Sequence, residues 1–229
     1  NVTTIVVEMI SMALQSQVSG GGAVAANQID EGVVTQVTEA IETATAVAVT
    51  PETALTAACT ALAAVEAVVD LDTEGSGEFR ESLVMSMSNV LLNTRVIGTS
   101  DDASDDASDI ASDDASATGQ QQCASASRRL SEGGASSAVP QTVNITLRTL
   151  AVVMVSQKVA DEGAAVAIAP SIGVASALVS ADGASASPIG LPAGTVQLPD
   201  GFTRDDGCAN LGARVLIFSW GAEVSAGLH

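Results

Sequence analysis

The densest group of reactive side chains is an acidic run at residues 100–118, where Asp, Ala and Ser recur with a four-residue beat (DDASDDASDIASDDAS). Seven aspartates fall between Asp101 and Asp114, and carboxylates are the ligands that calcium prefers. An EF-hand loop, however, needs acids at alternate positions, a central Gly and a closing Glu, and this order is absent. We therefore expect a solvated acidic loop over residues 100–137, which is compatible with diffuse, weak calcium binding but forms no defined metal site.

No motif typical of catalysis accompanies this run. The single histidine is His229, and Gly20-Gly21-Gly22 lacks the Lys and the preceding strand of a phosphate-binding loop. Adjacent acids such as Asp161-Glu162 and Asp205-Asp206 lie in polar stretches, whereas general acid–base catalysis needs carboxylates opposed across a cleft. We expect no enzyme activity, no cofactor and no metal site.

Three cysteines, Cys59, Cys123 and Cys208, allow at most one disulfide and lack metal-type spacing. Cys59 falls on an apolar helix face, where a buried free thiol is the common arrangement. Cys123 and Cys208 lie in polar loops, so they are the expected pair if the compartment is oxidising. The triplets Asn1-Val2-Thr3 and Asn144-Ile145-Thr146 make Asn1 and Asn144 candidate glycosylation sites.

Composition excludes some partners. The 229 residues carry a net charge of −19, which repels phosphate backbones and anionic lipid surfaces, so we expect no nucleic-acid binding. No uninterrupted apolar run reaches the length of about 18 residues typical of a spanning helix, so we expect no direct membrane insertion by this segment. The chain opens at Asn1 without a signal peptide or an initiator Met, which favours a piece of a longer or processed protein.

Apolar residues recur at intervals of three and four in five segments before residue 160, which predicts amphipathic helices. The segments are 2–18, 29–48, 51–69, 79–98 and 140–160. Thr50-Pro51-Glu52 is a strong helix start, since it combines a hydroxyl cap, Pro in the first turn and an acid at the positive end of the helix dipole. Because each of these helices has one apolar stripe that must be buried against a neighbour, we predict a helical bundle over residues 1–160.

Beyond residue 161 the spacing changes to the short alternating runs of β-strands. The expected strands are Ala165–Ala169, Ile172–Ser180, Thr195–Leu198 and Arg214–Trp220. In the last of these, Val215 and Ile217 face one way, with Ser219 as a further candidate on that face, and Leu216, Phe218 and Trp220 face the other. The predicted fold class is α+β, a helical bundle followed by a small, incomplete antiparallel β-sandwich over residues 161–229. Its open edges would need another protein chain or the rest of the same longer chain.

Three stretches carry a family resemblance: the helices opened by Thr50-Pro51-Glu52, residues 161–172 with Ile189-Gly190-Leu191-Pro192, and Val215–Gly221. Together they resemble the GAIN-type region, often associated with REJ segments, that precedes the membrane in polycystin-like proteins and adhesion receptors. The resemblance implies a helical subdomain followed by a partial β-sandwich. It also implies a non-enzymatic interaction or adhesion module at the extracellular face of a large cell-surface protein, with the cilium as one candidate location.

This chain departs from the family at its diagnostic feature. GAIN-type regions carry a self-cleavage site, His-Leu or His-Ile before Thr or Ser, whereas this chain ends Gly227-Leu228-His229, so no autoproteolytic residue is carried over. Two other functions remain open. One is a structural subunit of an extracellular or ciliary surface assembly that uses the sheet edges for polymer contacts. The other is a calcium- or small-ligand-binding module that uses the acidic run.

Overall fold

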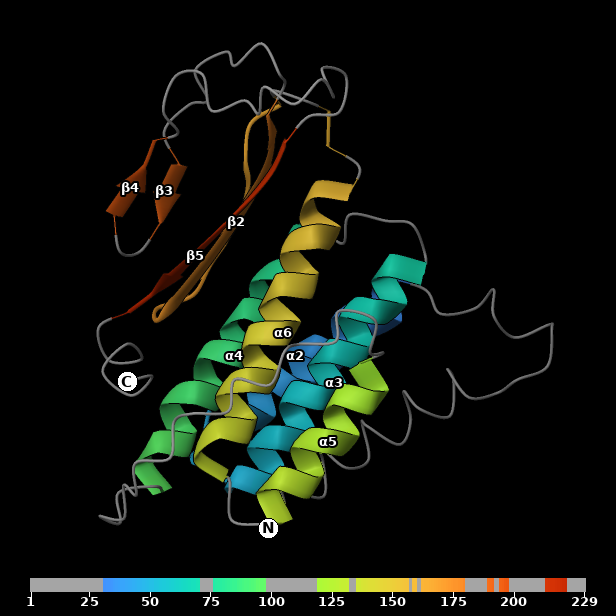
Figure 1. Ribbon diagram of the computed structural model, residues 1–229, viewed down its shortest axis with the longest axis vertical. Coiled ribbons are helices and arrows are strands. Elements are labelled where there is room, and N and C mark those ends of the chain that lie inside the picture. Colours follow the sequence, from blue (N-terminus) through green and yellow to red (C-terminus); the bar gives the residue numbers. More distant parts are fainter. Residues whose placement is uncertain are drawn as a thin grey trace, which may run out of the picture.

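The computed structural model describes residues 31–70, 76–97, 119–131, 135–156, 158–159, 162–179, 189–191, 194–197 and 213–221. In this part of the chain a group of helices carries a small antiparallel sheet, which confirms the α+β class (Figure 1). The helices are α2 (Glu31–Thr45), α3 (Pro51–Asp70), α4 (Gly77–Ile97), α5 (Gly119–Ser131) and α6 (Ala135–Ser156). The strands are β1 (Ala165–Ile168), β2 (Ile172–Val179), β3 (Ile189–Leu191), β4 (Gly194–Val196) and β5 (Ala213–Trp220). The helix expected at residues 2–18 lies outside the described residues.

Side-chain caps start two of the helices. At α3 the Thr53 amide donates to Oγ1 of Thr50 at 3.3 Å, and Pro51 is the first helical residue, so the predicted start is confirmed. At α4 the Phe79 amide donates to Oγ of Ser76 at 3.1 Å in the same way. Each cap satisfies one of the backbone donors that a helix leaves unpaired at its beginning.

Polar side chains of α4 hold it against α2. Three of them donate hydrogen bonds to backbone carbonyls of α2: Ser86 to Thr38, Asn89 to Glu42, and Asn93 to Thr45. The donors and acceptors advance along both helices together, so α4 runs parallel to α2. The amide of Asn93 also satisfies a carbonyl in the last turn of α2, which has no basic side chain to do so.

Helices α3 and α6 meet through small side chains. Fully buried alanines line α3 and let the backbones approach closely: Ala54, Ala57, Ala58, Ala61 and Ala64. The hydroxyl of Thr146 in α6 donates to the Ala58 carbonyl at 3.4 Å. By length and composition, segments Pro51–Val69 and Ala138–Ser156 of these two helices could cross a membrane, but 67% and 61% of them are buried inside the fold.

The junction between helices and sheet lies between Ser156, the last residue of α6, and Ala165, the first residue of β1. Beyond the end of α6, the carboxylate of Glu162 accepts a hydrogen bond from the Val159 amide at 3.2 Å and pairs with the Lys158 ammonium at 3.5 Å. Glu162 therefore closes the turn that leads into β1.

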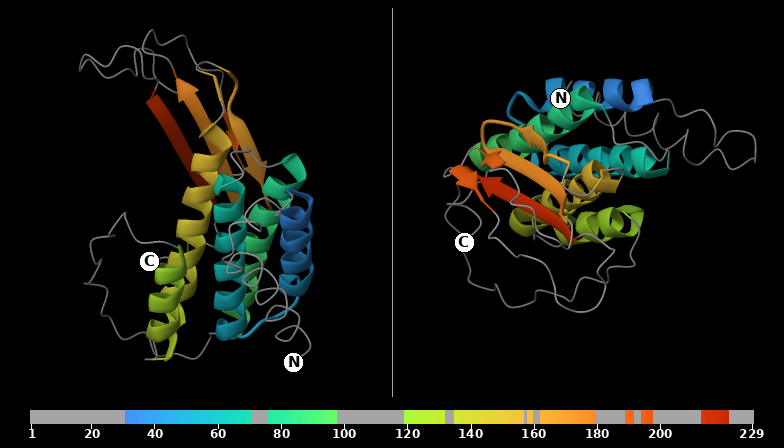
Figure 2. Two further views of the ribbon diagram at one scale, coloured as in Figure 1. Left: turned by 90° about the vertical axis from the view of Figure 1, so that its right-hand side faces the viewer. Right: turned by 90° about the horizontal axis from the view of Figure 1, so that it is seen from above.

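The main sheet has the order β1-β2-β5, with both pairs antiparallel. A tight turn at Pro170-Ser171 joins β1 to β2, because Ala169 and Ile172 exchange backbone hydrogen bonds of 2.8 and 3.4 Å. The predicted facing of β5 is confirmed: Leu216, Phe218 and Trp220 pack against the core that the helices form. Figure 2 shows this sheet lying over the helices.

A short hairpin of β3 and β4 lies on the other face of the sheet (Figure 1). Its Ile189 and Leu191 are buried with Ala175 of β2, and Val196 and Ile217 pack against them. Two sheets therefore face each other over a very small apolar layer, which confirms that the predicted β-unit is small and incomplete. The main core, by contrast, continues from the helices into Ile172 and Val174 of β2.

The acidic loop expected over residues 100–137 is wrong at its C-terminal end. Residues 119–131 form α5, and α6 begins at Ala135 rather than Pro140. Helix α5 (GQQQCASASRRLS) is polar over most of its surface, and its apolar residues Cys123, Ala126 and Leu130 form only a short, narrow stripe, which is a weak signal for a helix. Tertiary contacts hold it instead: Ala126 is only 7% exposed, and Cys123 is bonded to α3. The acidic run at 100–118 itself lies outside the described residues.

Candidate functional site

A disulfide joins α3 to α5. The expected pairing of Cys123 with Cys208 is wrong, because Cys123 is bonded to Cys59, with their Cα atoms 5.7 Å apart. The prediction failed because Cys59 looked like an ordinary apolar-face residue, and only the packing of α5 on α3 brings the second sulfur to it. Cys208 lies outside the described residues. Disulfides persist mainly in oxidising compartments.

One hollow of mixed polar and apolar lining lies between α6 and β5. This α6–β5 hollow has a volume of 360 Å³ and is lined by Pro140, Gln141, Asn144 and Arg148 of α6, Phe218 and Trp220 of β5, and Leu91 of α4. Gln141, Asn144 and Arg148 recur at intervals of three and four positions, so they form one stripe along the helix, and Pro140 lies next to Gln141. The two rings come from the inner row of β5, opposite Val174 and Ile172 of β2. The hollow thus combines flat aromatic surface with amide and guanidinium donors.

The aromatic rings make the α6–β5 hollow unusual for this chain. Aromatic residues are only 2% of the sequence, and Trp220 is its single tryptophan. A half-buried tryptophan usually has one edge exposed to solvent and the other packed against apolar side chains. Packing against the helices explains the buried part of Trp220, but not its position beside three polar side chains.

The candidate glycosylation residue Asn144 lines this same hollow, near the middle of α6. The third residue of its triplet, Thr146, is fully buried, and its hydroxyl donates to the Thr142 carbonyl at 2.9 Å and to α3. In the folded chain the two ends of the triplet therefore differ: Asn144 reaches the surface and Thr146 does not. Asn1 lies outside the described residues.

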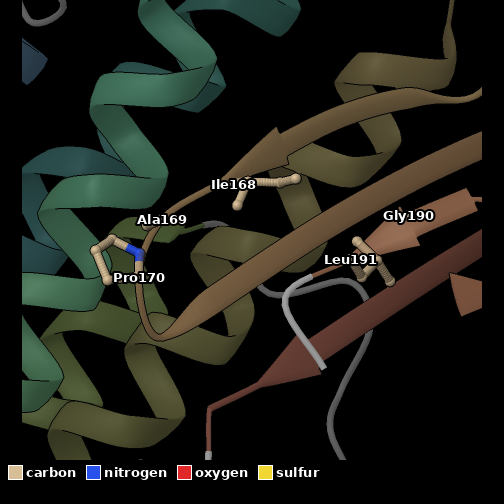
Figure 3. A pocket seen from close by; sticks show the side chains of 5 residues that line it. All are labelled: Ile168, Ala169, Pro170, Gly190 and Leu191. Atoms are coloured by element: carbon tan, nitrogen blue, oxygen red, sulfur yellow. The ribbon is translucent and has the colours of Figure 1, made fainter. Parts of the chain in front are cut away.

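A second hollow lies at the open edge of the sheet (Figure 3). This β1–β3 hollow has a volume of 530 Å³ and is lined by Ile168, Ala169 and Pro170, around the β1–β2 turn, and by Gly190 and Leu191 of β3. The lining carries no charged side chain. Val166 and Ile168 of β1 are 37% and 48% exposed, so an apolar strip continues from the hollow along the strand.

Strand β1 is an edge strand, since among the described strands it pairs only with β2. Native proteins protect such edges with Lys, Pro, bulges or short length. The sequence of β1, Ala-Val-Ala-Ile, has short length as its only protection. Its backbone therefore offers about four residues of pairing to a partner strand, next to the apolar strip.

The described residues contain no group of three or more His, Cys, Asp or Glu side chains that could hold a metal ion. Of the adjacent acids, Glu162 serves the turn after α6. Asp161, Asp205 and Asp206, like His229, lie outside the part of the chain that the structure describes.

Comparison with known protein families, with curated proteins and with solved structures finds no match to this chain. The functional assignment therefore depends on the two hollows, the open edge and the disulfide. Sequence reasoning missed Trp220 and Ile168 as site residues. Their one signal was composition: a tryptophan in a chain nearly free of aromatic residues, and a strand without a protective charge.

Proposed function

We propose that this chain is a non-enzymatic extracellular interaction module of a large cell-surface protein, of the polycystin-like or adhesion-receptor kind. The observation that carries the proposal is the open edge of β1, protected only by its short length, beside the β1–β3 hollow. An added strand would gain backbone hydrogen bonds from β1, and its apolar side chains would fill the hollow beside Ile168. The partner is another protein chain or a further part of the same longer chain.

The extracellular or cell-surface setting, with the cilium as one candidate, is supported by the Cys59–Cys123 bond. The charge of −19 fits this function as well, since it keeps a surface-exposed module soluble and disfavours nonspecific binding to anionic surfaces. Non-covalent adhesion through a small sheet edge is typical of weak, transient contacts, which gain strength when many copies act together.

The test applies purified, disulfide-intact protein to cells of the source organism and measures bound protein by flow cytometry. We expect saturable binding by the wild-type chain and its loss in Ile168→Asp, because a buried, unpaired carboxylate is costly in an apolar contact. The matched control is Val152→Asp, which places the same charge at an exposed valine of α6, 40% exposed. The proposal fails if the wild type shows no saturable binding or if both variants bind equally.

The same open edges favour one alternative, a structural subunit of an extracellular or ciliary surface assembly. In that function, the partner strand comes from a second copy of this chain. Sedimentation velocity over a range of protein concentrations separates the two functions. A structural subunit forms oligomers without cells, and Ile168→Asp returns it to the monomer, whereas an interaction module stays monomeric throughout.

A further inference from the structure

We propose that Asn144 carries an N-linked glycan whose first sugar ring lies in the α6–β5 hollow, stacked on Trp220. The proposal rests on the extracellular setting proposed above. Three independent features meet at this one place: the acceptor amide of a glycosylation triplet, the only tryptophan of the chain, and a hollow between them.

The chemistry of the lining suits an N-acetylglucosamine ring. One face of a pyranose is apolar and packs on flat aromatic surface, which Trp220 and Phe218 provide. Its hydroxyl and acetamido groups need hydrogen-bond donors and acceptors, which the Gln141 amide and the Arg148 guanidinium can supply from the same helix stripe. The volume of 360 Å³ lies at the lower end of the range of about 300–1,000 Å³ for small-molecule sites, which fits one ring rather than a long chain.

The occupant is fixed by covalent geometry. A ring linked to Nδ2 of Asn144 starts inside the hollow, because Asn144 itself lines it. The linkage therefore holds the ring at a high effective concentration next to Trp220, and a weak stacking contact is enough to seat it. A free sugar would have to bind this shallow site without that advantage.

The modification must precede folding of α6. The transferring enzyme needs access to the hydroxyl of Thr146, which in the folded chain is buried and bonded to the carbonyls of Thr142 and Ala58. On the extended chain, Nδ2 of Asn144 forms a bond to C1 of the first sugar of a lipid-diphosphate-linked oligosaccharide. The bond between C1 and the diphosphate oxygen breaks, the lipid diphosphate leaves, and one amide proton passes to solvent. Docking of α6 on α3 then brings the sugar to β5.

The experiment produces the full chain with a secretion leader in eukaryotic cells whose mannose trimming is inhibited, and collects both cells and medium. Trypsin releases Asn144 in the peptide 130–148, where mass spectrometry measures occupancy. Endoglycosidase H then leaves one N-acetylglucosamine on Asn144, whereas peptide N-glycosidase F removes the whole glycan. Because Trp220 is the only tryptophan, the emission spectrum reports on this hollow alone.

We expect the intact and the endoglycosidase H-treated proteins to share one emission maximum. After peptide N-glycosidase F we expect a shift to longer wavelength and stronger quenching by acrylamide, because the ring that covers Trp220 is gone. That enzyme converts Asn144 to Asp, so Asn144→Gln is the control that removes the glycan without adding charge, and it should show the same shifted spectrum.

Two results overturn the inference. One is an unmodified 130–148 peptide in both cells and medium. The other is a glycan on Asn144 whose complete removal leaves the emission of Trp220 unchanged. Neither result bears on the proposed adhesion function, because that function is measured by cell binding at Ile168, on the opposite face of the sheet from Trp220.

Discussion

Removal of the Cys59–Cys123 bond is the sharpest test of how this fold is held together. The bond closes a loop with a sequence separation of 64 residues. In the chain-entropy treatment, a cross-link that closes a loop of this length lowers the conformational entropy of the unfolded chain. This raises the free energy of the unfolded state by about 4 kcal/mol at 25 °C. Helix α5 depends on the bond further, since most of its surface is polar. We therefore expect the double variant Cys59→Ser/Cys123→Ser to lose about 4 kcal/mol of unfolding free energy.

The assay is urea unfolding of the oxidised wild type, the double variant and Cys208→Ser, followed by the fluorescence of Trp220 and by far-ultraviolet circular dichroism. In thermal unfolding of the same proteins, a loss of about 4 kcal/mol corresponds, for a chain of this size, to a fall in Tm of about 8–16 °C. Cys208→Ser is the matched control, because it removes a cysteine without touching the bond, and we expect its midpoint to equal that of the wild type.

Peptide mapping without reduction fixes the pairing before any variant is made. Trypsin places the three cysteines in separate peptides, which are the one ending at Arg80, 96–128 and 205–214. We expect the first two to be linked. A link between 96–128 and 205–214, or a double variant with the stability of the wild type, would refute the reasoning.

Three further substitutions test a hydrogen bond between helices, a helix cap and helix packing, each measured by the midpoint of urea unfolding. Asn93→Ala removes the donor to the Thr45 carbonyl and should lower the free energy of unfolding by about 1 kcal/mol. The control Glu81→Ala, at an exposed position of the same helix, should change it by no more than about 0.5 kcal/mol. Equal midpoints for the two variants would show that this hydrogen bond between α2 and α4 adds no stability. Thr50→Ala removes the cap of α3 and should cost about 1 kcal/mol, whereas Thr50→Ser should restore most of that stability, and failure of the serine to do so would argue against a capping role. Ala61→Leu overfills the fully buried face of α3 and should cost about 1–3 kcal/mol, so a neutral result would mean that the helices there are not closely packed.

The sequence predicts those parts of the fold in which each element carries its own signal. Thr50-Pro51 marks the start of α3 because capping is local chemistry, and alternation in Arg214–Trp220 predicts the two faces of β5 because a strand has period two. Helix α5 is different. Its sequence has only a short, narrow apolar stripe, so its structure depends on a disulfide and one buried alanine, and both depend on where α3 lies.

The candidate site is less predictable for the same reason. Asn144 is recognisable from its triplet, but its neighbours Phe218 and Trp220 are more than seventy residues away, and only the antiparallel register of β5 with β2 brings them to α6. The edge position of β1 likewise depends on the strand order β1-β2-β5, which periodicity does not determine. Elements follow from local patterns, whereas sites follow from the way in which elements pair.

The composition of the core explains why polar contacts and one cross-link matter so much here. Phe79 is the single aromatic residue among the largest fully buried side chains of the described residues, and buried alanines line α3. An aromatic residue can bury about 150–250 Å² and fixes its neighbours by shape, whereas alanine buries little and fits many arrangements. Small side chains do, however, bring backbones close enough for Ser86 and Thr146 to reach carbonyls on neighbouring helices. Hydrogen bonds at fixed positions therefore help to set the register between these helices, together with the packing of large side chains such as Leu83, Met87 and Leu150. Loss of one such bond should loosen the alignment of a helix pair as well as lower its stability.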